Sequence, residues 1–190
     1  MSTYEIAPRE VQERLERILF RHHKPLLAAE VQIRVIMAHA AVGDDGEPTG
    51  PALTAGGYQA AGLARIVNER DRAAGGPDAQ IVVDGDRWIE WSEAQRDALL
   101  DHESQHFELR TKDGDVVLDS LRRPKLRLRK HDHQFGWFAA VAERHGEASF
   151  EVQQAREIFE GAHGQILFPF AADAGHDAEG VVRMAARRGA

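Results

Sequence analysis

Apolar residues in the first forty positions follow a helical spacing and then an extended one. Residues 8–21 predict a helix, because their apolar positions recur every three or four residues and Pro8 suits a first turn. Those positions are Val11, Leu15, Ile18 and Leu19. In residues 29–38 every second side chain is apolar, which predicts a half-buried strand. Its apolar side carries Val31, Ile33, Val35 and Met37.

Three shorter segments follow. Residues 43–57 are rich in Gly, Pro, Asp and Thr, which predicts a loop. Residues 58–72 predict a second helix, because their aliphatic residues fall on one helical face. Residues 80–84 are β-branched and predict a short strand. If that strand lies at the edge of its sheet, its backbone could pair with an extended peptide.

The most specific helix signal lies in the middle of the chain. Ser92 and Gln95 form a capping box, which predicts a helix from Glu93 to about Phe107. Residues 108–130 contain two strand-like runs and predict a β-hairpin. Its second run is expected to turn Leu126 and Leu128 toward the core.

Two helices are predicted after the hairpin. Asp132 is placed to cap a helix that ends at Gly146. The apolar face of that helix is expected to hold Phe135, Phe138, Ala139 and Ala142. Residues 150–159 predict a last helix, and residues 171–190, rich in Ala, Gly and charge, predict a poorly ordered tail.

Length and composition favour one α+β domain. The 190 residues, with 43% hydrophobic and 29% charged residues, are typical of a soluble globular protein. We expect this domain to span residues 1–148, with residues 149–190 forming a C-terminal helix and flexible tail. A net charge of -7 argues against wholesale binding to nucleic acid or an anionic membrane. No signal segment or membrane-spanning run is visible, which predicts a cytoplasmic location.

One five-residue motif carries specific chemistry. His102, Glu103 and His106 match the pattern H-E-x-x-H. On a helix, imidazoles four residues apart share one face and can bind one tetrahedral zinc ion, while Glu103 lies beside the ion and can take a proton from its water. The alternative is a polar group satisfied in the core, which is costly to bury without a purpose. The chain has no cysteine, so further ligands must be His, Asp or Glu.

A catalytic zinc site needs a third protein ligand. His131 is the favoured candidate, because it lies one helical turn before Phe135 on the inward side of the predicted helix. His133 and Asp132 remain alternatives, although Asp132 is better used as a helix cap.

Several stretches of the chain resemble the phage metallopeptidase family, a group of small zincin-like proteins. The matching stretches are residues 91–96, 98–103, 105–106, 123–125, 127–132, Phe135 and 143–146. The resemblance implies a zincin-like fold, in which a small mixed sheet and an H-E-x-x-H helix are followed by a β-hairpin and a helix. It also implies one catalytic zinc ion on His102 and His106, with Glu103 as base, and it supports His131. Gln134 stands where the family commonly has an acidic residue.

The sequence thus predicts a zinc-dependent metallopeptidase acting on peptides or proteins in a bacterial or phage-infected cell. Glu103 would be the general base, and Tyr58, His133 and Arg129 are candidate oxyanion stabilisers. The motif also fits hydrolysis of another substrate. A second reading is a metal-stabilised module that binds nucleic acid or a protein through the basic strand 122–130. Its contacts would be Arg123, Lys125, Arg127 and Arg129. A solvated strand face is the favoured reading of this run.

Overall fold

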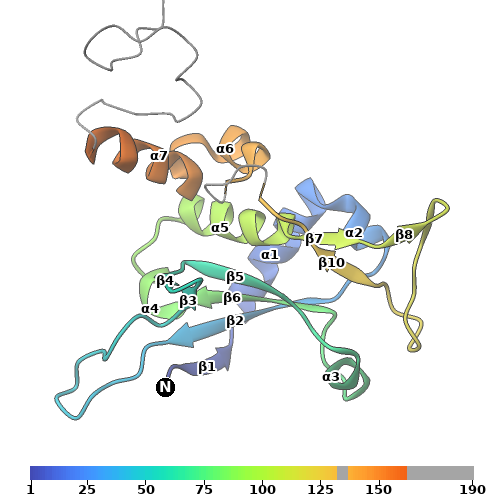
Figure 1. Ribbon diagram of the computed structural model, residues 1–190, viewed down its shortest axis with the longest axis horizontal. Coiled ribbons are helices and arrows are strands. Elements are labelled where there is room, and N and C mark those ends of the chain that lie inside the picture. The colour runs from blue at the N-terminus through green and yellow to red at the C-terminus, as the bar shows by residue number, and fades with distance from the viewer. Residues whose placement is uncertain (132–136, 162–190) are drawn as a thin grey trace, which may run out of the picture.

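A four-stranded sheet underlies the helices in the computed structural model, which describes residues 1–131 and 137–161 (Figure 1). Its strand order is β1 (Thr3–Ile6), β2 (Ile33–His39), β6 (Ala79–Asp84) and β5 (Gly62–Ile66). The two central strands run parallel, and the two edge strands run antiparallel to their neighbours. The sheet is therefore mixed, and the fold is α+β as the sequence predicts.

One face of this sheet makes the main core. The alternation in β2 buries Ile33, Val35 and Met37 on the side of the helices, as predicted. In β6, Ala79, Ile81 and Val83 share that side. The opposite face is apolar too, with Ala38, Val82 and Leu53 in a smaller cluster. Leu53 belongs to the predicted loop, so this loop covers part of the second face.

Two long helices, α1 (Arg9–His22) and α5 (Glu93–Gln105), pack against each other over the main core (Figure 1). The predicted apolar face of α1 is buried throughout. The capping box of α5 is confirmed, since the Gln95 backbone N–H donates to Ser92 Oγ at 3.3 Å and the Ser92 N–H donates to Gln95 Oε1 at 2.9 Å. This cap fixes the residue at which α5 begins. It therefore also fixes the direction in which each side chain of α5 points.

The remaining elements are short. They are α2 (Lys24–Ala28), β3 (Thr54–Ala55), β4 (Tyr58–Gln59), α3 (Glu69–Ala73), α4 (Gly85–Trp88), β7 (Phe107–Leu109), β8 (Thr111–Lys112), β9 (Asp115–Val116), β10 (Leu126–Leu128), α6 (Ala139–His145), the 3-10 turn Gly146–Ala148 and α7 (Phe150–Gly161). The predicted hairpin is confirmed in part: its second run is β10, which pairs antiparallel with β7, while Val116 of the first run pairs in the small β8–β9 hairpin. In the described parts of the chain, none of the helices is long and apolar enough to cross a membrane.

The helix predicted over residues 58–72 is wrong. This stretch forms β4, the edge strand β5 and the five-residue helix α3. The physical reason is that both faces of β5 carry apolar side chains, with Ala64 in the main core and Leu63 against the smaller cluster. A strand that is apolar on both faces lacks the alternation that would have identified it, so helical spacing fits it as well.

Three other expectations need correction. The strand 80–84 lies in the centre of the sheet as β6, so it cannot pair with a substrate; β5 is the edge strand beside it. Leu126 is buried, but Leu128 is 50% exposed, because β10 pairs on one side only and is three residues long. The helix expected after Asp132 begins at Ala139 with Phe138 as N-cap, and Phe138 and Val141, rather than Ala139, are buried. Residues 132–136 and 171–190 lie outside the described residues.

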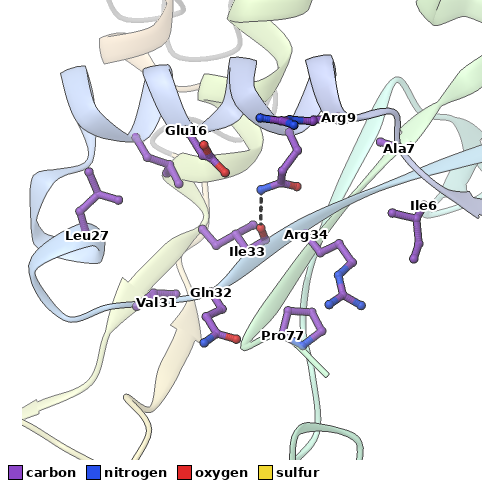
Figure 2. A pocket seen from close by; sticks show the side chains of 12 residues that line it. Ile6, Ala7, Arg9, Glu16, Leu27, Val31, Gln32, Ile33, Arg34 and Pro77 are labelled. Atoms are coloured by element: carbon purple, nitrogen blue, oxygen red, sulfur yellow. Dashed lines mark hydrogen bonds between the residues drawn. The ribbon is translucent and has the colours of Figure 1, made fainter. Parts of the chain in front are cut away.

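A groove of about 580 Å³ lies between α1 and the start of β2 (Figure 2). Gln12 lines it and donates a hydrogen bond from Nε2 to the Ile33 carbonyl at 2.9 Å. No histidine lines this groove. It is therefore separate from the chemistry of the H-E-x-x-H motif.

A buried carboxylate ties three helices together beside that motif. Asp101 of α5 is fully buried and accepts hydrogen bonds from His23 Nε2 at 2.7 Å and His145 Nε2 at 2.8 Å. Arg144 adds two more, from Nε at 2.7 Å and Nη2 at 2.8 Å. His23 follows α1, and the other two partners end α6, so the carboxylate fixes both helices to α5. Burial alone would raise the pKa of Asp101, but these donors hold it well below its usual range.

Replacing Asp101 should destabilise the fold markedly. We expect Asp101→Asn to lower the free energy of unfolding by about 3 kcal/mol, since the Arg144 charge loses its buried partner, and to lower Tm by roughly 6–12 °C. Asp97→Asn is the matched control one turn earlier on α5, because Asp97 pairs with Arg14 at the surface and should contribute no more than about 1 kcal/mol. Thermal unfolding followed by circular dichroism measures both. Equal Tm losses in the two variants would contradict the role given to Asp101.

Candidate metal centre

The end of α5 presents the three residues of the motif. His102 and Glu103 lie in the last turn of the helix, and His106 is its C-cap. The chain then enters β7 at Phe107. The partner strand β10 ends opposite Phe107, so the chain returns to the C-terminal end of α5. The Arg129 N–H donates to the His106 carbonyl at 2.7 Å and so anchors the segment that leads to His131.

His131 joins the two helix histidines. One ligand nitrogen from each of His102, His106 and His131 can be chosen so that all three lie within 4.8 Å of one another. Among the described side chains, those of residues 1–131 and 137–157, this is the one group of three or more His, Asp or Glu residues close enough to hold a metal ion. The helical-phase argument for His131 does not hold, because α6 begins later; the β7–β10 pairing is what brings His131 here.

The spacing of the nitrogens suits a small cation. His102 Nε2 and His131 Nε2 lie 3.2 Å apart. Two ligand nitrogens at the usual Zn–N distances on a tetrahedral ion would lie ~3.3 Å apart. Two lone pairs at this distance repel each other unless a proton or a cation lies between them. The spacing of His102 and His131 therefore suits two ligands of one small cation, and His106 lies close enough to be a third.

Phe138 packs against all three rings. Its ring centroid lies 5.0 Å from that of His102, 4.8 Å from His106 and 4.9 Å from His131, and its side chain is fully buried. Phe138 is the N-cap of α6, the helix that Asp101 holds at its other end. The imidazoles are thus held against a rigid apolar surface.

Hydrogen bonds on the outer nitrogens fix two of the ring orientations. His106 Nδ1 donates to the Arg129 carbonyl at 2.8 Å, and His102 Nδ1 lies 2.6 Å from Glu151 Oε1. Each bond directs the Nε2 lone pair toward the shared centre and makes the ring a stronger ligand. Glu151 lies in α7, three residues beyond the boundary predicted at residue 148, and nothing in its local sequence marks this role.

The protonation tendencies of the site follow from burial and from these bonds. Burial lowers the pKa of His106 to about 4, so its lone pair is available at neutral pH. Burial also lowers the pKa of His102, but the hydrogen bond to Glu151 and the charges of Glu103 and Glu151 outweigh it and raise the pKa. Burial raises the pKa of Glu103 to about 7, partly offset by the charge of His102.

Glu103 is buried against the edge strand β5. It is 4% exposed, and the nearby Ala64 backbone N–H acts to lower its pKa. A pocket of about 340 Å³ opens beside it. The pocket is lined by Ala55, Ala61, Gly62, Leu99, His102, Glu103, His131, Trp137, Phe150, Glu151 and Gln154. His102, His131 and the carboxylates of Glu103 and Glu151 thus border a cleft of mixed polarity that is large enough to admit part of a ligand.

The other predicted site residues fare differently. Asp132 and His133 lie outside the described residues. Tyr58 is 81% exposed on β4 and does not line the pocket. The guanidinium of Arg129 lies 5.1 Å from the Phe138 ring centroid, close to the histidines.

The basic strand is largely committed to ion pairs. Arg123 Nε lies 2.9 Å from the buried carboxylate of Asp78. Arg127 binds Glu108 through two nitrogens, at 2.7 and 2.9 Å. Lys125 is half-buried beside them. This pattern favours the reading of an ion-paired strand face over a phosphate-binding one.

Comparison with known proteins adds one finding to this geometry. No curated protein and no solved structure matches the chain. A family model described as "Putative phage metallopeptidase" matches residues 2–160, which include every described element from β1 to α7 except the last residue of α7. The metal-compatible histidines, the buried glutamate and this match agree, and the chain belongs to the phage metallopeptidase family.

Proposed function

We propose that this chain is a zincin-like, zinc-dependent metallopeptidase. His102, His106 and His131 would hold one zinc ion, and Glu103 would be the general base. The observation that carries the proposal is that three histidine nitrogens lie within 4.8 Å of one another. A buried glutamate, Glu103, lies next to His102 on α5. Three protein ligands leave a fourth position open, as catalytic zinc sites require. Asp132 and His133 remain the alternative third ligands.

The roles of the residues follow from their positions. Zinc, when bound, supplies a Lewis acid that polarises a carbonyl and acidifies water. Glu103 would take the proton of the attacking water and pass it to the leaving amine. Glu151 would keep the His102 proton on Nδ1. Phe138 would exclude water from one side of the histidines.

The edge strand β5 is the proposed docking strand for an extended peptide. Hydrogen bonds from Val67 N to Asp78 O and from Asp84 N to Ala61 O show that odd-numbered residues of β5 face β6. In an antiparallel pair the residues between them direct N–H and C=O outward. Gly62 and Ala64 are therefore the outward residues, and Gly62 also lines the pocket. A substrate added along this edge would pass beside Glu103.

Metal binding and catalysis should separate in variants. Wild-type protein should carry about one zinc per chain. Glu103→Gln should keep the zinc but lose hydrolysis by at least about 100-fold, because the base is gone while the ligands remain. His106→Ala should lose both. Elemental analysis and a broad peptide-library assay measure the two properties.

His39→Ala is the control for these variants, because His39 bonds to Asp86 away from the motif and should keep both zinc and activity. His131→Ala should weaken zinc retention as His106→Ala does. Wild-type protein that binds no zinc would refute the proposal. Zinc binding without cleavage of any peptide would refute the peptidase activity alone.

Glu151 should tune the affinity for zinc. Glu151→Gln removes the negative charge that faces His102 Nδ1, so we expect zinc affinity to fall by about 10- to 100-fold. Gln154→Ala is the matched control one turn along α7, since Gln154 lines the same pocket but bonds to Trp137. Competition with a chromogenic chelator measures both. Unchanged affinity in Glu151→Gln would contradict the role given to this carboxylate.

A further inference from the structure

The contact between Glu103 and β5 is closer than any side chain at position 62 would permit. A Cβ atom built on Gly62 would lie 2.6 Å from Glu103 Oε1, 2.9 Å from Cγ and 3.0 Å from Cδ. Real Cβ atoms essentially never approach other heavy atoms so closely. The place of the glutamate therefore depends on the missing side chain at Gly62.

The next outward residue of the strand holds the carboxylate from the other direction. The backbone N–H of Ala64 lies near enough to act on the Glu103 carboxyl, and it points away from β6 because of the alternation described above. The backbone of an edge strand in a sheet is rigid, and here it supplies both a donor and the room for the acceptor. The helix cap fixes the position of the Glu103 backbone on α5, and β5 fixes the position of the Glu103 carboxylate.

The carboxylate has one direction in which it can yield. It is the far end of a flexible side chain, and the pocket of about 340 Å³ lies beside it. A methyl group at position 62 would thus move the carboxylate toward the pocket rather than unfold the protein. To regain a contact of 3.4 Å, Oε1 must move by about 0.8 Å.

We propose that Gly62, together with the backbone of Ala64, positions the catalytic base, so that β5 acts as a template for Glu103. This inference rests on the proposed function of Glu103. Displacements near 1 Å can cost about 100-fold in rate when reacting groups are pre-aligned. The three atoms nearest a Cβ at Gly62 all belong to Glu103 and none to a histidine, so metal binding should be independent of this position.

The test compares Gly62→Ala with Gly50→Ala. Gly50 is the matched control, because a Cβ there meets nothing within 4 Å and its φ lies outside the left-handed region. Gly62→Ala should keep about one zinc per chain and a KM near that of wild type, while kcat falls by about 100-fold. Gly50→Ala should change none of these. Equal kcat values in the two variants would overturn the proposal.

A second variant separates positioning from general damage to the strand. Glu103→Ala removes the Cγ, Cδ and Oε1 atoms that a methyl at 62 would meet and leaves a residual kcat as the reference. In that background, adding Gly62→Ala should change kcat by no more than about threefold, because the coupled contact is already gone. A full 100-fold loss in both backgrounds would show that Gly62 acts through something other than Glu103.

A crystal structure of Gly62→Ala makes the test independent of peptidase activity. The Glu103 carboxylate should be shifted into the pocket, with the three histidines in place. A Glu103 carboxylate that keeps its wild-type position beside Ala64 would overturn the positioning role. If wild-type protein cleaves no peptide but the shift is seen, the proposed function fails and the positioning of Glu103 stands.

Discussion

The buried carboxylate of Asp101 is the interaction on which the arrangement of helices depends. Asp101 directly precedes His102, and its carboxylate accepts four hydrogen bonds from His23, Arg144 and His145. Through them α1 and α6 are fixed to α5 at the level of the motif. The other end of α6 carries Phe138, which packs on all three histidine rings. A charge with no direct part in the proposed chemistry thus sets the surface on which the candidate ligands rest.

The site itself is built on two rigid supports that meet at Glu103. Helix α5 presents the motif in a fixed phase, and the edge strand β5 receives the glutamate through Gly62 and Ala64. The third histidine comes from the β7–β10 pairing, and Glu151 from α7 completes the outer bond of His102. Burying these polar groups costs free energy unless each has a partner. Glu151 and the Arg129 carbonyl supply partners for the outer nitrogens of two histidines and leave their lone pairs directed inward.

The sequence predicted what local signals can encode. Spacing and capping placed α1, β2 and α5 with their buried faces, and the motif predicted the two histidines that the structure brings together. Helical phase points to His131, but α6 begins only at Ala139, so this argument does not hold. The residue nevertheless lies beside the other two histidines. Glu151 was missed because its partner is 49 residues away and no spacing marks it. The spacing in β5 also fits a helix because both its faces are apolar. The sequence therefore does not identify β5 as the edge strand.

Anomalous diffraction at the zinc absorption edge, on crystals grown with zinc, tests the metal centre most directly. The account predicts one strong peak within about 2.1 Å of a nitrogen from each of His102, His106 and His131, with a further position open on the side of Glu103. A peak held by other residues, or none at these three histidines in fully folded protein, would contradict it.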